Sequence, residues 1–177
     1  MKSNWNLVRF GNILAHIIVV VVNSLAGASG INGLQTGAIS DKYATLIAPA
    51  GYVFSIWFVI YLLLLGYVVY QFSDKRRESP FQDKIGYIFI VSCIINICWL
   101  LLWHYEMIAV SVILMLGLLL SLITLYTRLG VGVEKVQRSE MLFVHLPFSV
   151  YLGWITVATI ANIAAALVSL GQTELLL

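Results

Sequence analysis

The stretch GYVFSIWFVIYLLLLGYVVYQF, residues 51–72, contains no charged side chain. A helix of roughly 20 apolar residues spans the hydrocarbon core of a bilayer, which is about 30 Å thick. Lipid offers no hydrogen-bond partner to open backbone groups, so a segment in that core must satisfy its backbone internally, as a helix does. The stretch is therefore predicted to be a transmembrane helix.

Four further runs of the same kind extend this prediction to the whole chain. They cover residues 10–26, 85–103, 107–129 and 141–170. Hydrophobic residues make up 61% of the 177 positions and charged residues only 10%, which leaves far less polar surface than a soluble domain needs. Barrel strands would alternate in polarity, and these runs do not. We predict an all-α integral membrane bundle of five transmembrane helices, forming one domain over residues 1–177.

The first run has an alternative interpretation. Lys2 and Arg9 precede it, and small residues at 26–28 resemble the cleavage site of a signal peptide. We expect a retained helix instead.

Basic residues predict the orientation of the chain. If the chain crosses the membrane five times, nine of the ten Lys and Arg residues lie on one side of the membrane, and only Lys42 lies on the other. The side rich in basic residues usually faces the cytoplasm. We expect a protein of the cell membrane with its N-terminus inside and its C-terminus outside. The inner set is Lys2, Arg9, Lys75, Arg76, Arg77, Lys84, Arg128, Lys135 and Arg138.

The outer connection at residues 27–49 is long for so small a bundle. Connections of this length are usually functional or disordered, and the four glycines in this one favour mobility. We expect it to fold over the outer helix ends as a lid. The inner connection at residues 73–84 carries a Lys-Arg-Arg run that is expected to set topology, with contact to lipid headgroups as the alternative.

Catalytic and metal-binding patterns are absent from the sequence. It contains no His-Cys cluster at metal spacing, no Gly-rich phosphate loop and no nucleophile with a nearby base. Few ionisable groups lie within the spans, which argues against a proton relay. His16 and His145, both in the cytoplasmic half, are candidate haem ligands, although a single membrane histidine more often bonds a neighbouring helix. We expect a protein that is not an enzyme, requires no cofactor or metal and has no nucleic-acid partner.

Three spans carry aromatic and polar residues at helical spacing, so that each set shares one helix face. At a rise of about 1.5 Å per residue, the inner members lie roughly 6–12 Å below the outer edge of the bilayer. The three sets are Phe54, Trp57 and Tyr61; Asn96, Trp99 and Trp103; and Tyr151, Trp154, Ala158 and Asn162.

Two interpretations of these stripes remain open. In one, the aromatic residues form an interfacial belt and pack helices, with Ala158, Ala161 and Ala165 allowing close packing in a homodimer or a larger complex. The protein would then be a structural or accessory subunit. In the other, the stripes line an aromatic pocket with a few polar groups, the usual form of a small-molecule site. A transporter is a third possibility, but no broken helix pair is visible.

The chain resembles the TspO/MBR family, the tryptophan-rich sensory proteins related to the mitochondrial translocator (peripheral benzodiazepine receptor) protein. The segment Pro49-Ala50-Gly51-Tyr52-Val53-Phe54, followed by Trp57 and Tyr61, is similar to the family's Pro-Pro-Gly-Trp-Val-Phe and Trp-x-x-x-Tyr patterns. Asn96 and Trp99 match Asn-x-x-Trp of the third helix. Tyr151-Leu152-Gly153-Trp154, Ala158 and Asn162 match the fifth helix.

This resemblance implies a five-helix membrane protein that binds hydrophobic small molecules, with tetrapyrroles (porphyrin or haem) and sterol-like compounds as usual ligands and a sensory, regulatory or transport-related role. Carried over, the ligand-binding residues are Trp57, Tyr61, Asn96, Trp99, Trp154, Ala158 and Asn162. Porphyrin degradation is claimed for some members, but the Lys-Pro-x-Trp pattern of their first loop is missing here. The chain therefore resembles a divergent branch of the family.

Overall fold

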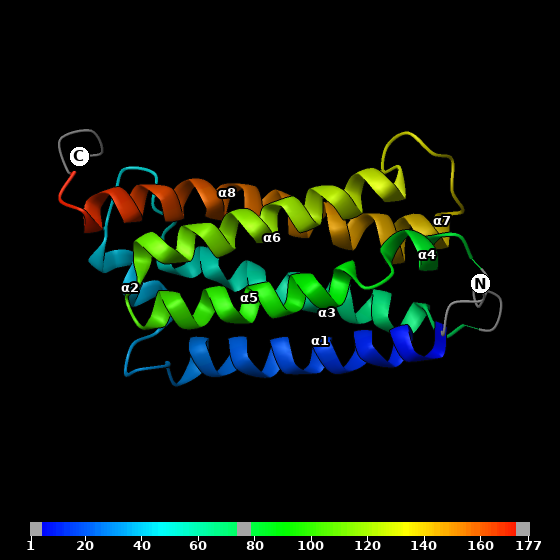
Figure 1. Cartoon of the computed structure of the whole chain (residues 1–177), viewed down its shortest axis with the longest axis horizontal. Coiled ribbons are helices and arrows are strands. Elements are labelled where there is room, and N and C mark those ends of the chain that lie inside the picture. Colours follow the sequence, from blue (N-terminus) through cyan, green and yellow to red (C-terminus); the bar gives the residue numbers. More distant parts are fainter. Residues whose placement is uncertain (1–4, 74–78, 173–177) are drawn as a thin grey trace.

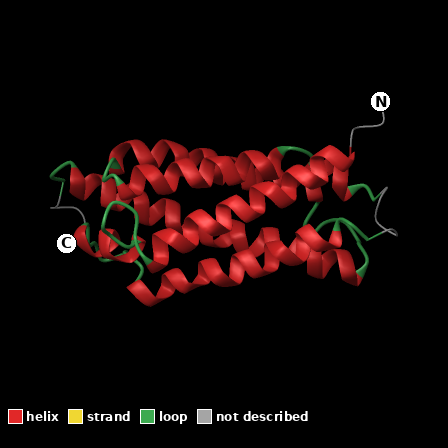
Figure 2. Ribbon diagram, turned by 90° about the horizontal axis from the view of Figure 1, so that it is seen from below, coloured by secondary structure: helices red, strands yellow, loops and turns green. Residues whose placement is uncertain are grey.

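The structure is a computed structural model that describes residues 5–73 and 79–172. Within those residues, five helical segments are long and apolar enough to cross a membrane: Asn6–Ala28, Gly51–Tyr70, Phe81–His104, Ile108–Leu129 and Arg138–Ser169. They lie side by side along one long axis (Figures 1 and 2). The predicted all-α membrane bundle is therefore confirmed.

The helices follow the predicted spans but differ at their ends. The five long ones are α1 (Trp5–Ala28), α3 (Ile56–Tyr70), α5 (Ile88–His104), α6 (Ile108–Leu129) and α8 (Leu146–Ser169). α1 begins five residues before its predicted start at Phe10 and includes Arg9, which is only 3% exposed. Short elements precede three of the others: the 3-10 turn η1 (Gly51–Ser55), α4 (Phe81–Ile85), and α7 (Arg138–Glu140) with the π-helical turn η3 (Met141–His145).

The third span is interrupted near its start, which the sequence pattern did not indicate. Gly86 ends α4 with φ 49° and ψ −131°, a backbone conformation that is essentially restricted to glycine. The break lets α4 pack against α6, where Phe81 and Ile85 are fully buried. The predicted span over 85–103 thus corresponds mainly to α5, which begins three residues later at Ile88, and α4 precedes it.

Helix packing in the bundle is uneven. α6 packs extensively against both α5 and α8, whereas α1 packs mainly against α5 and less closely against α3. In the half of the bundle near the N-terminus, Tyr67, Phe89 and Phe148 form an aromatic core with ring centroids 5.2–6.0 Å apart. The looser α1–α3 contact leaves room for a cavity.

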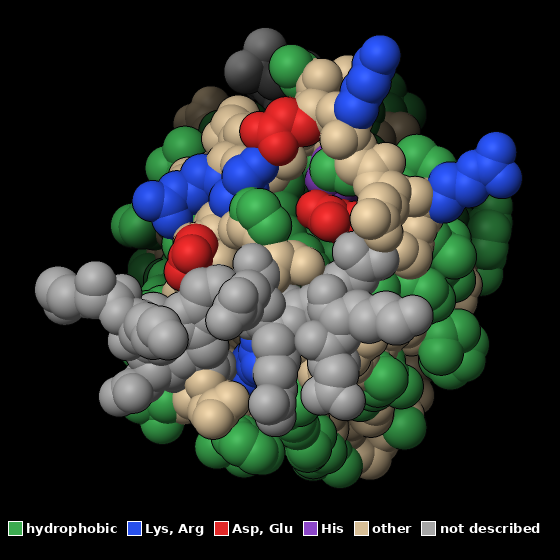
Figure 3. Space-filling model, turned by 90° about the vertical axis from the view of Figure 1, so that its right-hand side faces the viewer, with side chains coloured by type: hydrophobic (Ala, Val, Ile, Leu, Met, Phe, Trp, Pro, Cys, Tyr) green, Lys and Arg blue, Asp and Glu red, His purple; other side chains and the backbone are tan. Residues whose placement is uncertain are grey.

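Charged residues gather at the end of the bundle that holds the N-terminus, α4 and α7 (Figures 1 and 3). The described basic residues at this end are Arg9, Lys84, Arg128, Lys135 and Arg138. Lys42 lies at the opposite end, in α2 (Thr36–Lys42). Lys2, Lys75, Arg76 and Arg77 fall outside the described residues. The segregation agrees with the charge pattern used above, and the direction of insertion in the membrane stays a prediction.

The segment at residues 29–50, named here the α2 cap, is folded onto the end of α5. Ile39 of the cap is fully buried. The His104 ring bonds Thr36 Oγ1 and the Ile31 carbonyl, both at 3.0 Å, and Trp103 Nε1 donates to the Thr36 carbonyl at 3.3 Å. Gly30 adopts φ 78° in the tight turn of the cap that precedes α2. Two of these anchors, Trp103 and His104, belong to α5, so the cap is attached to a long helix.

A second attachment joins the cap to the turn between α5 and α6. Glu106 accepts hydrogen bonds from Lys42 and, at 2.8 Å, from the Tyr43 hydroxyl. The Lys42 hydrogen bond holds the pKa of Glu106 below its usual range. The same bond raises the pKa of Lys42.

Candidate functional site

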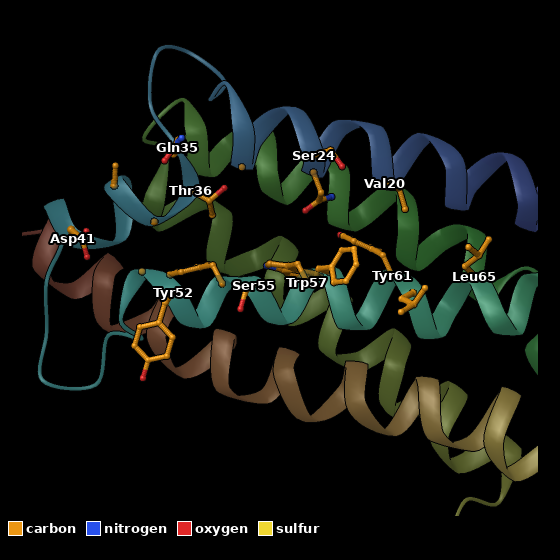
Figure 4. Close-up of a pocket in the computed structure, with 18 of the residues that line it drawn as sticks. Val20, Ser24, Gln35, Thr36, Asp41, Tyr52, Ser55, Trp57, Tyr61 and Leu65 are labelled. Atoms are coloured by element: carbon orange, nitrogen blue, oxygen red, sulfur yellow. The ribbon is translucent and has the colours of Figure 1, made fainter.

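A cavity of about 760 Å³ lies between α1 and α3, beneath the α2 cap. It extends from Asp41 and Tyr52 near the cap to Leu65, more than halfway along the span (Figure 4). The distance from Gly51 to Leu65 along the helix axis is roughly 20 Å at the usual helical rise. The cavity is therefore elongated along the bundle.

The α1 wall consists of residues that share one helix face. His16, Val20, Asn23, Ser24 and Gly27 are spaced by three or four residues, or by one, and face α3 across the cavity. Their side chains are small or polar, so they fill less space than the leucines and isoleucines elsewhere on α1. The spacing of His16 and Asn23 was visible in the sequence, but nothing indicated which helix this face would meet.

The α3 wall combines aromatic and aliphatic side chains. Trp57 and Tyr61 point toward α1 (Figure 4) and stack on each other, with ring centroids 5.5 Å apart and an interplanar angle of 17°. Phe58, Leu62 and Leu65 line the same cavity and are 73%, 57% and 46% exposed. These exposed apolar residues form the edge at which the cavity meets the side of the bundle, where lipid would lie.

Two polar atoms in the cavity wall have no hydrogen-bond partner. The hydroxyl of Tyr61 and Nδ1 of His16 are both buried and unpaired. The two rings approach edge to face, with centroids 6.4 Å apart. They lie on opposite walls, one on α3 and one on α1.

Asn96 lies behind the α1 wall rather than in it. Its Oδ1 accepts a hydrogen bond from Asn23 Nδ2 at 2.9 Å. Asn23 Nδ2 also donates to the Val19 carbonyl. Asn23 lines the cavity, so Asn96 holds a cavity residue in place.

A second, much smaller space lies on the other side of Trp57, between α3, α5 and α8. Its volume is about 30 Å³, room for one or two water molecules. Trp99 Nε1 donates to Asn162 Oδ1 at 2.9 Å, and Asn162 Nδ2 donates to Ser111 Oγ at 3.0 Å, which ties α5, α6 and α8 together. The residues around it are Ser40, Tyr43, Ala48, Pro49, Phe54, Trp57, Trp99, Trp103, Trp154, Ala158, Ala161, Asn162 and Ala165.

A family model with the description TSPO-like protein matches residues 8–177. The chain belongs to this family. Comparisons with curated proteins and with solved structures found no match. Family membership and the five apolar helices together make the chain an integral membrane protein, and the family is in general one of ligand-binding membrane proteins.

In this TSPO-like chain, the residues expected to bind ligand divide between the two spaces. Trp57 and Tyr61 line the large cavity. Trp57 also borders the small space, together with Trp99, Trp154, Ala158 and Asn162. Asn96 lines neither. Helical spacing shows which residues share a face, but not whether neighbouring side chains fill the space that the face meets.

Trp57 is the wall between the two spaces. Its ring contacts Trp99, Tyr151 and Trp154 at centroid distances of 6.4, 5.9 and 6.2 Å. These contacts hold the indole from the packed side, while Tyr61 stacks on it and the residue also lines the large cavity. The residue is therefore both part of the core and part of the site.

The two histidines proposed as haem ligands have different surroundings. His16 lines the cavity, whereas His145 belongs to η3 and does not. Among the described residues, no group of three or more His, Cys, Asp or Glu side chains is placed to hold a metal ion. A role for His16 would therefore be in contact with a molecule inside the cavity.

Proposed function

We propose that this protein binds a hydrophobic small molecule of tetrapyrrole-like or sterol-like shape in the cavity between α1 and α3. The observation that carries the proposal is the cavity's volume of about 760 Å³ together with its aromatic wall. Small-molecule sites are typically concave, about 300–1,000 Å³ in volume and mostly apolar, with a few polar groups. The protein would act as a binding component with a sensory, regulatory or transport-related role rather than as an enzyme.

Aromatic contact supplies most of the binding in this proposal. Trp57 and Tyr61 are stacked and held from behind, so a flat apolar ligand finds a rigid surface that loses little conformational entropy on binding. Exposed Phe58 and Leu62 lead from the side of the bundle into the cavity. A ligand dissolved in the membrane would enter there, between α1 and α3.

The α2 cap closes the end of the cavity. Gln35, Thr36 and Asp41 of the cap line it, and the cap is fixed to α5 through Thr36. We propose that the cap restricts exchange with water and favours exchange with lipid.

Titration of the purified protein with two probes tests this function. Protoporphyrin IX is followed by its absorption spectrum, and the fluorescent sterol dehydroergosterol by energy transfer from tryptophan. Trp57→Leu is expected to weaken binding of whichever probe binds by about tenfold, because the main stacking surface is lost. Phe148→Leu is the control, since Phe148 is a buried aromatic residue that borders neither space and contacts Tyr67 and Phe89.

Circular dichroism must show that both variants remain folded. Equal affinities of Trp57→Leu and Phe148→Leu for the bound probe would refute the cavity as the site. Failure of both probes to bind the parent would refute the proposed ligand class.

The structural-subunit interpretation has one observation in its favour, the nearly filled space around Trp99 and Asn162. The alanine stripe, however, does not offer a surface for a second copy. Ala158, Ala161 and Ala165 border this internal space between α3, α5 and α8. A homodimer stays a prediction, to be tested by sizing in detergent with cross-linking.

A further inference from the structure

The wall of the large cavity contains a pair of polar groups that the protein does not satisfy. The Tyr61 side chain is 9% exposed and His16 is 4% exposed, yet the Tyr61 hydroxyl and His16 Nδ1 form no hydrogen bond. Buried polar atoms in native proteins are nearly always paired, and exceptions require an explanation. Neither atom is accessible to water, so solvent does not supply the missing partner.

The two groups face each other from helices that pack loosely. His16 is on α1 and Tyr61 is on α3, with ring centroids 6.4 Å apart. α1 packs mainly against α5, so a small displacement of α1 from α3 retains the main packing of α1. A ligand group that enters from the cavity between these two rings would meet both polar atoms.

The charge of the cavity wall restricts what that group can be. Among the described residues that line the cavity, none is Lys or Arg, and the one carboxylate is Asp41 near the cap. A ligand carboxylate would therefore have no cation to pair with and would lie in an apolar wall at considerable desolvation cost. A neutral group is the better match.

We propose that His16 and Tyr61 determine specificity by binding one neutral oxygen, a hydroxyl or a carbonyl, at one end of an otherwise apolar ligand. The Tyr61 hydroxyl donates to that oxygen. A ligand hydroxyl in turn donates to His16 Nδ1, whereas a ligand carbonyl accepts from the other histidine tautomer, in which Nδ1 carries the proton. The proposal rests on the proposed function and selects, within it, neutral ligands over those with free carboxylates.

Matched ligand pairs test this selection. Cholesterol and cholest-5-ene differ only in the hydroxyl, and both compete with dehydroergosterol for the cavity. The parent is expected to prefer cholesterol by about three- to tenfold, the contribution of a hydrogen bond that pairs an otherwise orphaned group. Cholestenone, which has a carbonyl instead, separates the two kinds of oxygen, and protoporphyrin IX is compared with its dimethyl ester to test charge.

Variants locate the effect. Tyr61→Phe and His16→Leu are each expected to reduce the preference for cholesterol, and the double variant to abolish it, while affinity for cholest-5-ene stays within about twofold. Tyr52→Phe is the matched control, because Tyr52 lines the cavity but is 82% exposed, so its hydroxyl reaches water. Tyr61→Phe removes only an unpaired hydroxyl, so it is expected to fold as the parent does.

Several results would overturn the proposal while leaving the proposed function intact. These are equal affinity of the parent for cholesterol and cholest-5-ene, a preference that survives in the double variant, and tighter binding of protoporphyrin IX than of its diester. If no sterol or porphyrin binds at all, the proposed function fails and this proposal fails with it.

Discussion

Replacing Asn162 by Leu tests whether the small space between α3, α5 and α8 is packing or ligand site. Asn162 is 2% exposed and connects Trp99 of α5 with Ser111 of α6. Leu has a similar size but no hydrogen-bonding group, so the substitution mainly deletes these bonds. The Trp99 Nε1 donor is then left without its partner, whereas the Ser111 hydroxyl keeps its bond to the Ile108 carbonyl at 2.8 Å.

The expected loss of stability follows from these bonds. Hydrogen bonds between membrane helices contribute about 0.6 kcal/mol on average and up to about 1.7 kcal/mol. Two such bonds are lost, and one buried donor is orphaned at a cost of about 1–3 kcal/mol in soluble proteins. We expect Asn162→Leu to lower the free energy of unfolding by about 1–3 kcal/mol.

Reversible unfolding by SDS in mixed micelles, followed by far-UV circular dichroism, measures this loss. Thr156→Val is the control on the same helix, because Thr156 is exposed and bonds only the Leu152 carbonyl one turn back. A double-mutant cycle with Ser111→Ala isolates the Asn162–Ser111 bond, for which we expect a coupling of about 0.6 kcal/mol.

Ligand affinity gives the second half of the test. Asn162 does not line the large cavity, so affinity for a bound probe is expected to change less than twofold in the folded variant. The reasoning is refuted if stability stays within about 0.5 kcal/mol of the parent, a change typical of surface positions. A variant that is stable but loses its ligand would instead place the site at Asn162.

Three further predictions concern the backbone and the α2 cap. Gly86→Ala is expected to cost about 1–3 kcal/mol in the same unfolding assay, because φ 49° and ψ −131° suit only glycine; an unchanged stability would mean that the α4–α5 break is not required. Gly30→Ala is expected to loosen the cap more than Gly33→Ala. Both glycines have positive φ, but only at Gly30 would a new Cβ lie 2.6 Å from the Leu34 carbonyl oxygen. The rate of proteolysis of the cap measures this difference, and equal rates for the two variants would contradict the prediction. Acidification is expected to weaken the attachment of the cap at Glu106. The pKa of Glu106 in the folded protein is lowered, chiefly by the Lys42 hydrogen bond. The stability that Glu106 contributes is therefore present above the ordinary pKa of 4.5 and is lost as the pH falls through the lower pKa of the folded state. Proteolysis of the cap at pH 7 and at pH 3.5 with an acid-active protease, relative to an unfolded substrate, checks this, and Glu106→Gln should remove the pH effect.

The membrane bundle itself was predictable from the sequence. Five apolar runs of helical length, four of them without a charged residue and the one at 107–129 with only Arg128 near its end, predict helices, because a helix satisfies its own backbone hydrogen bonds in lipid. The spacing of Trp57 and Tyr61 also placed these two residues on one face, and both line the large cavity. These properties depend on composition and on period within a single helix.

The break at Gly86 shows where sequence pattern becomes insufficient. Gly86 is the second residue of the apolar run that begins at Ile85, and a glycine at that position is compatible with either a continuous helix or a break. The break accompanies the packing of α4 against α6 and the burial of Phe81 and Ile85. Such a choice depends on a neighbour that is distant in sequence.

The location of the cavity was decided only by tertiary structure. Trp99 belongs to the predicted stripe of α5, and Ala158 and Asn162 belong to that of α8, but the side chains of three helices meet there and leave about 30 Å³. His16, Asn23 and Ser24 belong to a less conspicuous face of α1, yet about 760 Å³ remains in front of them, because α1 packs mainly against α5 rather than α3. Periodicity determines which residues lie together on one helix. The volumes and approach of side chains from the other helices determine whether the space in front of that face is filled.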